Sequence, residues 1–179
     1  ITEDAALQVA GTFDPKGRFT ANPASGVGHS AGAVEFVDAS REATVQGVNE
    51  FQAFVCTTPG KTIRFGTAAA DKITINAGKN FIMKGAEGNP VSLLSTADGT
   101  PWQIAMNPNP GVAEVKYVAV KDSNGSSGAP MLAISSQNLG NNTNWGFSNP
   151  IVPGETITWT GAANDDWNEP ANWSRGRMV

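Results

Sequence analysis

The sequence predicts an all-β fold, and in particular a right-handed parallel β-helix with three strands per turn. Short segments of alternating apolar and polar residues recur along the chain, and turns rich in Gly, Pro, Asn or Asp separate most of them. Strands that are separated by two others lie at a nearly constant offset of about 29 residues, as Ile63 does from Val91 and Ile73 from Trp102. A repeat of this length is typical of a solenoid. A β-sandwich is the alternative, because it also contains regularly spaced short strands.

The composition suits strands and tight turns better than helices. Charged residues make up only 16% of the 179 residues, against about a quarter in ordinary soluble proteins. The chain contains 20 Gly and 11 Pro, which favour turns. No window shows an apolar stripe with helical spacing. Composition and pattern therefore point to the same fold class.

Three regions are expected along the chain. Residues 1–30 should form an N-terminal arm or a first turn, with short β candidates at 6–10 and 18–21. Residues 31–149 should form the β-helix domain. Residues 150–179 should form a Trp-rich β segment or the start of a further repeat, because they hold three of the five tryptophans.

The regular strand pattern begins at residues 33–37, where Val34 and Phe36 share one face. Further strands are predicted at 42–47, 51–56, 61–65, 73–76, 81–84, 91–94, 102–105, 112–121 and 131–136. A single turn cannot bury its own apolar face, so the inward residues of stacked turns should form one continuous core. These inward positions are Phe54, Cys56, Ile63, Phe65, Ile73, Ile75, Phe81, Met83, Val91, Leu93, Ile104, Val115, Tyr117, Leu132 and Ile134.

The charge pattern argues against two classes of partner. The net charge is −4, the pI is about 4.9 and Lys and Arg do not cluster, so we expect no binding to nucleic acid or to anionic membranes. No apolar run approaches the length needed to insert into a bilayer. Because the chain starts at Ile1 rather than Met, we expect a processed or excised segment, for example one that follows a removed signal peptide.

The reactive residue types give no catalytic, cofactor or zinc site. Cys56 is the only cysteine and lies on the same strand face as Phe54, which predicts an inert buried thiol. His29 is the only histidine and lies in a Gly-rich stretch, so a loop role is expected. A structural zinc site usually needs four such ligands. We expect no catalytic residue and no bound cofactor.

One cluster of oxygen ligands is a weak candidate for calcium. It consists of Asn164, Asp165, Asp166, Asn168 and Glu169. Calcium prefers six to eight oxygen ligands of this kind. The spacing does not match the EF-hand loop, however, so an Asx-rich turn is the preferred interpretation.

The three C-terminal tryptophans allow two roles. Trp159, Trp167 and Trp173 follow at offsets of eight and six residues, so they can share one face and pack on each other. They can also stack on sugar rings, which makes glycans a possible partner. Mutual packing is the preferred interpretation.

A β-helix enzyme acting on polysaccharides would need two carboxylates about 5–10 Å apart on one outer face. The acidic residues expected to face outward are scattered over strands and turns: Glu35, Glu42, Asp71, Glu87, Asp98, Glu114 and Asp122. No catalytic pair can be chosen from them, so a carbohydrate-active enzyme stays an alternative to a non-catalytic role.

Self-assembly is expected at the ends of the solenoid. A strand edge without a partner recruits another strand, and no charged helix that could cap either end is visible in the sequence. The segment Ala5, Ala6, Leu7, Gln8, Val9 and Ala10 is a plausible strand to donate to a neighbour. Head-to-tail contacts that do not close would give filaments.

A resemblance covers most of the chain. Residues 32–36, 43–47, 51–56, 58–65, 88–93, 99–102, 115–122 and 140–147 follow one another in an order that resembles the β-helical repeat modules of large bacterial cell-surface and secreted proteins, such as adhesins and autotransporter passengers. The tail, with Trp159, Trp167 and the Ala171-Asn172-Trp173-Ser174 sequence, is similar to the short Trp-rich element that introduces a further repeat in such proteins.

The resemblance implies an exported, extracellular or cell-surface protein with a structural or adhesive role, and no common active site. Our leading hypothesis is therefore a non-catalytic structural module, either a self-assembling surface or filament subunit or a repeat of an adhesin. Its partners would be copies of itself or further repeats of a longer chain. A glycan- or surface-binding module is the second hypothesis, and an enzyme the third.

Overall fold

The structure, a computed structural model, describes residues 6–9, 18–20, 33–148, 158–167 and 172–173. The chain forms two compact units, unit 1 (residues 1–148) and unit 2 (residues 149–179). The described part of unit 1 consists of strands and turns without an α-helix, and every pairing between its strands is parallel. The all-β prediction is confirmed, and the pairing differs from the antiparallel sheets of a sandwich.

The described strands of unit 1 pair in three parallel ladders. Ladder 1 contains β1 (Ala6–Val9), β3 (Ala33–Phe36), the second half of β5 (Val48–Cys56), the second half of β7 (Lys72–Lys84), β10 (Ala113–Lys116), β13 (Met131–Ile134) and β15 (Trp145–Ser148). Ladder 2 contains β4 (Ala43–Val45), β6 (Thr62–Phe65), β8 (Val91–Ser95), β11 (Val118–Val120) and β14 (Gln137–Asn138). Ladder 3 contains β2 (Arg18–Thr20), the first halves of β5 and β7, β9 (Trp102–Met106) and β12 (Ser123–Asn124).

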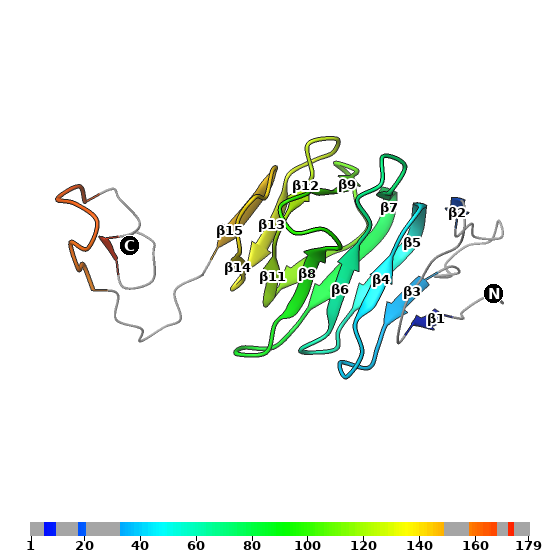
Figure 1. Ribbon diagram of the computed structural model, residues 1–179, viewed down its shortest axis with the longest axis horizontal. Coiled ribbons are helices and arrows are strands. Elements are labelled where there is room, and N and C mark those ends of the chain that lie inside the picture. Colours follow the sequence, from blue (N-terminus) through cyan, green and yellow to red (C-terminus); the bar gives the residue numbers. More distant parts are fainter. Residues whose placement is uncertain (1–5, 10–17, 21–32, 149–157, 168–171, 174–179) are drawn as a thin grey trace. The chain divides into compact units, whose positions relative to one another are not determined.

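From β3 onward the chain visits the ladders in a fixed rotation, from ladder 1 to ladder 2 to ladder 3 and back. In the last turn, between β14 and β15, ladder 3 is represented by the parallel bridge of Thr143 with Asn124 rather than by a strand. Figure 1 shows the strands of ladder 2 side by side, in the order β4, β6, β8, β11 and β14. Because β5 and β7 each run through the corner from ladder 3 to ladder 1, these two ladders belong to one 10-stranded sheet of the described strands, and ladder 2 forms a 5-stranded sheet. This order is compatible with a β-helix.

The offset between paired strands is less regular than the sequence predicts. Ile63 pairs with Leu93 rather than with Val91, and Ile73 pairs with Ile104 rather than with Trp102. In both cases the observed partner lies two positions beyond the predicted one. Because side chains alternate between the faces of a strand, a shift of the pairing by two residues leaves each side chain on the same face. Toward the C-terminus the turns become much shorter, since Met131 already pairs with Trp145.

Two predicted strand boundaries are wrong. The predicted strands 73–76 and 81–84 belong to a single strand, β7, whose middle residues are exposed at the corner between ladders. Conversely, the predicted strand 112–121 is divided into β10 and β11 by Tyr117, whose φ of 51° lies in the left-handed region. One residue in this conformation suffices to turn the chain from ladder 1 to ladder 2.

The core runs through all three ladders of unit 1. The strands β3, β6 and β8 alternate buried and half-buried residues, as the pattern predicts. Aromatic rings lie at the centre of this core, where Phe54 packs against Phe36 and Phe51 with centroid distances of 5.0 and 4.7 Å. Phe65 and Trp102 stack at 4.1 Å, which joins ladder 2 to ladder 3.

Three of the predicted core positions are corrected. Leu132 and Ile134 are 58% and 37% exposed, whereas Met131 and Ala133 are buried. The register explains the difference, because Ile134 pairs with Lys116 and therefore shares its outer face. Tyr117 is half-buried at its corner. In a strand that is apolar on both faces, alternation cannot tell the inner face from the outer one.

A buried lysine holds one of the turns. The side chain of Lys61 is fully buried, and its Nζ donates hydrogen bonds to the main-chain oxygens of Asp38, at 3.2 Å, and Arg41, at 2.7 Å. Burial lowers the pKa of this amine. The contacts fix the turn between β3 and β4, where Asp38 has a φ of 62°.

Candidate functional site

The C-terminal end of ladder 1 is the candidate interaction edge of unit 1. β15 is the last strand of its sheet order, and in the described residues no strand lies on its far side. Its side chains Trp145 and Phe147 are half-buried against the core, with ring centroids 6.1 Å apart. The Nε1 of Trp145 donates a hydrogen bond of 2.9 Å to the Ser123 Oγ. The core thus ends in two aromatic residues on an edge strand.

Hydrogen bonds show which main-chain groups the edge presents. The amides of Met131 and Ser135 donate to the carbonyl oxygens of Asn144, at 3.1 Å, and Ser148, at 2.6 Å. Main-chain groups alternate in direction along a strand. Because the Ser148 carbonyl faces β13, the N–H and C=O groups of Phe147 and of Trp145 face away from it. Two donors and two acceptors therefore point outward from β15.

Asparagine side chains shape the last turn before this edge. The Nδ2 of Asn142 donates to the Val120 carbonyl at 2.8 Å, and its Oδ1 accepts from the Ser123 amide at 3.0 Å. The Nδ2 of Asn144 donates to the carbonyls of Gly125 and Gly128. Asn144 has a φ of 64°, a conformation that asparagine adopts more readily than most residues. The Asn-rich sequence at 141–144 therefore closes the last turn without a long loop.

The predicted donor strand lies at the opposite end of the same ladder. Ala6, Leu7, Gln8 and Val9 form β1, which pairs in parallel with β3 of its own chain, from Ala6 with Ala33 to Val9 with Phe36. Ala5 and Ala10 lie outside the described residues, as does His29. β1 and β15 are thus the first and last strands of one parallel ladder.

Four of the acids expected to face outward have local partners, namely Glu42, Asp71, Asp98 and Glu114. The Glu42 carboxylate pairs with Arg64 at 2.9 Å, which lowers the pKa of Glu42, and Glu114 pairs with Lys84 at 2.8 Å. Asp98 pairs with Lys121. Asp71 accepts hydrogen bonds from the amides of Gly47 and Ala68. These contacts are those of structural ion pairs and turn caps, with no paired carboxylates among them.

Asp122 corrects the expectation for this group, because its side chain is buried rather than outward, with 1% of the residue exposed. Its Oδ1 accepts a hydrogen bond of 2.7 Å from Asn141 Nδ2, and its Oδ2 accepts one of 2.9 Å from the Gly99 amide. Burial opposes ionisation, but these two hydrogen bonds and the charge of Lys121 leave the pKa of Asp122 below its ordinary value. The carboxylate joins the turns that precede β9 and follow β14.

The Asp122→Asn variant should therefore be less stable at neutral pH and less sensitive to acid. A carboxyl whose folded pKa is lowered stabilises the fold above its unfolded pKa of about 3.9 and loses this contribution as pH falls through the folded pKa. Asparagine replaces one of the two accepting oxygens by an NH2 group, so that one of the two donors loses its acceptor, which should cost about 1–3 kcal/mol at pH 7. Urea unfolding at pH 7 and pH 3 measures both effects.

The matched control for Asp122→Asn is Asp98→Asn. The Asp98 side chain is 83% exposed, and its ion pair with Lys121 lies in solvent, so its loss should cost less than about 1 kcal/mol. Two results would show that the buried carboxylate does not act as described. One is an equal loss in the free energy of unfolding at pH 7 for the two variants. The other is an Asp122→Asn chain that loses as much free energy of unfolding between pH 7 and pH 3 as the wild type does.

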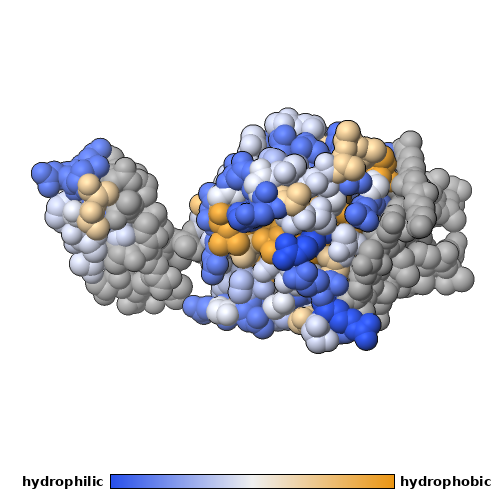
Figure 2. All heavy atoms as spheres, viewed as in Figure 1, coloured by the Kyte–Doolittle hydropathy of each residue, from blue (hydrophilic) through white to orange (hydrophobic). Residues whose placement is uncertain are grey.

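Grooves on unit 1 are open and mostly lined by small or polar residues. One groove, of about 590 Å³, runs beside β9 and is lined among others by Thr74, Asn76, Asn107 and Ser127. A smaller groove of about 230 Å³ lies between Met106, Pro110, Val115 and Leu132. Figure 2 shows separate hydrophobic patches among hydrophilic residues on the face in view. Neither groove gathers reactive side chains.

Cys56 lies in the core, as the sequence predicts. Its side chain is fully buried, and burial raises the pKa of its thiol. A thiol in this environment is a poor nucleophile, because the thiolate is the reactive form.

Unit 2 holds the three C-terminal tryptophans together. Trp159 and Trp173 form an antiparallel bridge. The Trp167 ring lies nearly parallel to that of Trp159, at 16° and 6.4 Å, and perpendicular to that of Trp173, at 87° and 4.4 Å. The Nε1 of Trp173 donates to the Trp167 carbonyl at 3.0 Å. The described tryptophans of this unit thus pack on each other, while Trp167 and Trp159 stay 62% and 39% exposed.

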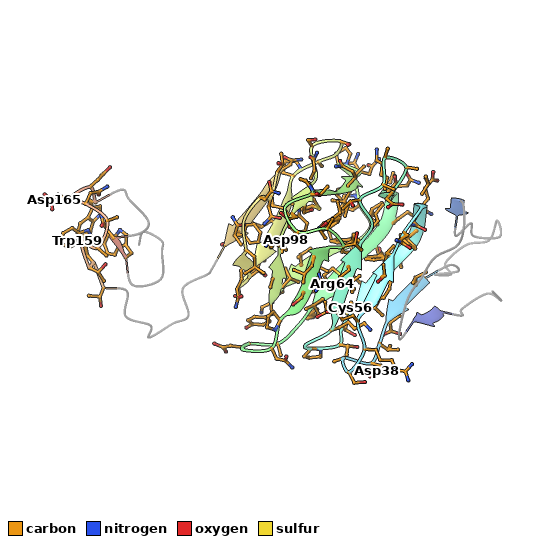
Figure 3. All side chains as sticks on the ribbon, viewed as in Figure 1. Asp38, Cys56, Arg64, Asp98, Trp159 and Asp165 are labelled. Atoms are coloured by element: carbon orange, nitrogen blue, oxygen red, sulfur yellow. The ribbon has the colours of Figure 1, made fainter. Side chains whose placement is uncertain are left out.

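The calcium candidates are partly engaged in a turn. Asn164 Oδ1 accepts hydrogen bonds from the Asp166 amide and from the Nδ2 of Asn172, both at 2.9 Å. Asp165 is exposed (Figure 3), and Asn168 and Glu169 lie outside the described residues. Within the described ranges, no three His, Cys, Asp or Glu residues come together as a metal site would require.

Sequence reasoning placed Asp122 on the outer face and assigned no role at an interaction edge to Trp145 and Phe147. The sequence does contain a signal for the edge strand. Trp145 and Phe147 are two positions apart and therefore share one face, and they are followed by Asn149-Pro150 rather than by another apolar segment.

Comparison with protein-family models, with curated proteins and with solved structures gives no match for this chain. None of the described residues forms a helix long and apolar enough to cross a membrane.

Proposed function

We propose that unit 1 is a right-handed parallel β-helix with three strands per turn, and that the chain is a non-catalytic, extracellular structural module of the kind found in adhesins and surface filaments. The fixed rotation through three parallel ladders supports the β-helix, although the lengths of its turns vary. The resemblance to repeat modules of bacterial surface proteins supports the location.

The outward main-chain groups of β15 carry the proposal of end-to-end assembly. They offer pairing sites to a further strand, and a strand that pairs there would extend the core beyond Trp145 and Phe147. The partner is a second copy of this chain or a further repeat of a longer chain. In a second copy β1 fits best, because it is the first strand of the same ladder and would add in the same parallel sense. Such a contact does not close on itself and gives filaments.

Light scattering and negative-stain electron microscopy at micromolar concentration test the proposal. The full chain should assemble into fibres, and deletion of residues 1–12, which removes β1, should leave a soluble folded monomer. Phe147→Pro should also prevent assembly, because proline lacks the outward N–H. Phe147→Leu is the matched control, since it keeps this N–H and an apolar side chain.

Two results would contradict the proposal of self-assembly. One is a full-length chain that remains a monomer of 18.6 kDa at high concentration. The other is normal assembly of the chain that lacks residues 1–12. Urea unfolding of each variant separates a loss of assembly from a loss of folding, because both variants should still unfold cooperatively.

A further inference from the structure

Unit 2 presents aromatic surface in an ordered arrangement. Trp173 is only 5% exposed and forms the base of the cluster, while the nearly parallel rings of Trp159 and Trp167 lie at the surface. Gly161 approaches Trp159 so closely that an added Cβ would lie 2.8 Å from the ring atom Cη2. The Trp159 indole is thus held by packing and still 39% exposed, so part of an ordered ring is open to a ligand.

The amide of Asn172 holds this arrangement in place. Asn172 is fully buried, and its Oδ1 accepts hydrogen bonds from the amides of Ala163 and Asn164 at 2.7 and 3.0 Å. Its Nδ2 donates to the Asp166 carbonyl at 2.8 Å. One side chain thus fixes the turn that carries Trp167 next to the strand that carries Trp159. Because the two rings are already ordered, less side-chain entropy is lost when a ligand binds to them.

The surroundings of the two rings indicate the chemistry of a ligand. The electron-rich face of an indole attracts C–H groups of partial positive charge, and a pyranose with equatorial substituents presents such groups on its faces. The exposed carboxylate of Asp165, two positions from Trp167, can accept hydrogen bonds from hydroxyls. Residues 149–179 contain two Arg against four Asp or Glu, a net charge of −2, which disfavours anionic sugars and nucleic acids.

We propose that Trp159 and Trp167 form a binding site for a neutral, β-linked oligosaccharide, whose pyranose rings stack on the exposed indole faces. This site lies within unit 2 and does not depend on the assembly proposed for unit 1. A module with both properties would combine a structural stem with attachment to a polysaccharide.

Nuclear magnetic resonance of the full-length Phe147→Pro chain, which should stay monomeric and leaves unit 2 unchanged, tests the site with three probes: the hexamers of β-1,4-linked glucose and of β-1,4-linked N-acetylglucosamine, and polygalacturonate as an anionic control. At least one neutral hexamer should shift the indole N–H resonances of Trp159 and Trp167, and polygalacturonate should not. Trp167→Ala and Trp159→Ala should each weaken binding by about tenfold or more. Trp167→Tyr should keep most of it, because tyrosine retains a ring face.

The indole N–H of Trp173 reports the fold of unit 2 in every variant, because it bonds to the main-chain oxygen of Trp167, which substitution of the side chain leaves in place. Leu132→Ala is the control for a general loss of exposed apolar surface. The proposal is overturned if millimolar hexamer leaves both resonances of the Phe147→Pro chain unshifted, if only other residues respond, or if folded alanine variants in the same background bind as tightly as that chain.

Discussion

Replacing Phe54 by alanine is expected to lower the free energy of unfolding by about 3–5 kcal/mol, which is a large part of the stability of an ordinary domain. Phe54 is fully buried, and its ring contacts those of Phe36, Phe51, Phe65 and Phe81 with centroid distances of 5.0, 4.7, 6.2 and 6.0 Å. The contacts belong to strands of successive turns. The cavity left by alanine would therefore weaken the stacking of several turns together.

Chemical unfolding of the variant, followed by circular dichroism, measures this effect. Leu132→Ala is the control, because Leu132 is apolar but 58% exposed on the outer face of the same ladder, and its loss should change stability by less than about 0.5 kcal/mol. A cost for Phe54→Ala no greater than that of the control would mean that Phe54 is not at the centre of the core.

Gly128→Ala is expected to cost about 1–3 kcal/mol through steric overlap with the main chain. An added Cβ at Gly128 would lie 2.5 Å from the Met106 carbonyl oxygen and 3.0 Å from the Ala105 carbonyl carbon. The same Met106 oxygen accepts a hydrogen bond of 2.7 Å from the Ala129 amide. Main-chain atoms cannot rotate away as a side chain would, so β9 or the turn after β12 must shift.

Gly146→Ala is the matched control for this variant. The nearest atom to an added Cβ at Gly146 is the Leu132 Cδ1, at 3.5 Å, which is an ordinary contact. Its stability should lie within about 0.5 kcal/mol of the wild type. Thermal unfolding of both variants in parallel provides the comparison. A Gly128→Ala melting temperature equal to that of Gly146→Ala would contradict the close approach of Gly128 to the main chain of β9.

The sequence was sufficient to predict strands and faces where apolar and polar residues alternate strictly. Ile63, Ile73 and Ile75 are buried as predicted, because each has polar neighbours on both sides in the sequence. Exact pairing was not predictable in the same way. Ile73 pairs with Ile104 instead of Trp102, and since Trp102 lies two positions away on the same face, the pattern is equally good for both registers.

Prediction failed where local pattern does not distinguish the alternatives. In the strand Met131–Ile134 every residue is apolar, so only the pairing of Ile134 with Lys116 decides which face is buried. Asp122 was expected outside because carboxylates are mostly exposed. Its burial depends on Asn141 and Gly99, which are distant in sequence and reach it only once the turns stack.

For the candidate sites the same limit holds. The sequence pointed to β1 as a strand for assembly and to the tryptophans of unit 2 as a cluster, because both are visible as local patterns. It could not show that the main-chain groups of Trp145 and Phe147 point outward from the last strand. This depends on which main-chain groups of β15 form hydrogen bonds with β13.

The unequal lengths of the turns, short at both ends of unit 1 and long in the middle, set an expected order of folding. The paired residues Met131 and Trp145 are less than half as far apart in the sequence as the paired residues Ile73 and Ile104. Closing the shorter loop costs roughly 0.7 kcal/mol less entropy at 25 °C, and contacts that are local in sequence form faster. The last turns should therefore form early. The pairs Ala33–Ala53 and Ala43–Ile63 are also close in the sequence, only 20 residues apart, so the first turns should form early as well, and the longer middle turns should follow. During synthesis, which proceeds from the N-terminus, the first turns can therefore fold while the longer middle turns are still incomplete.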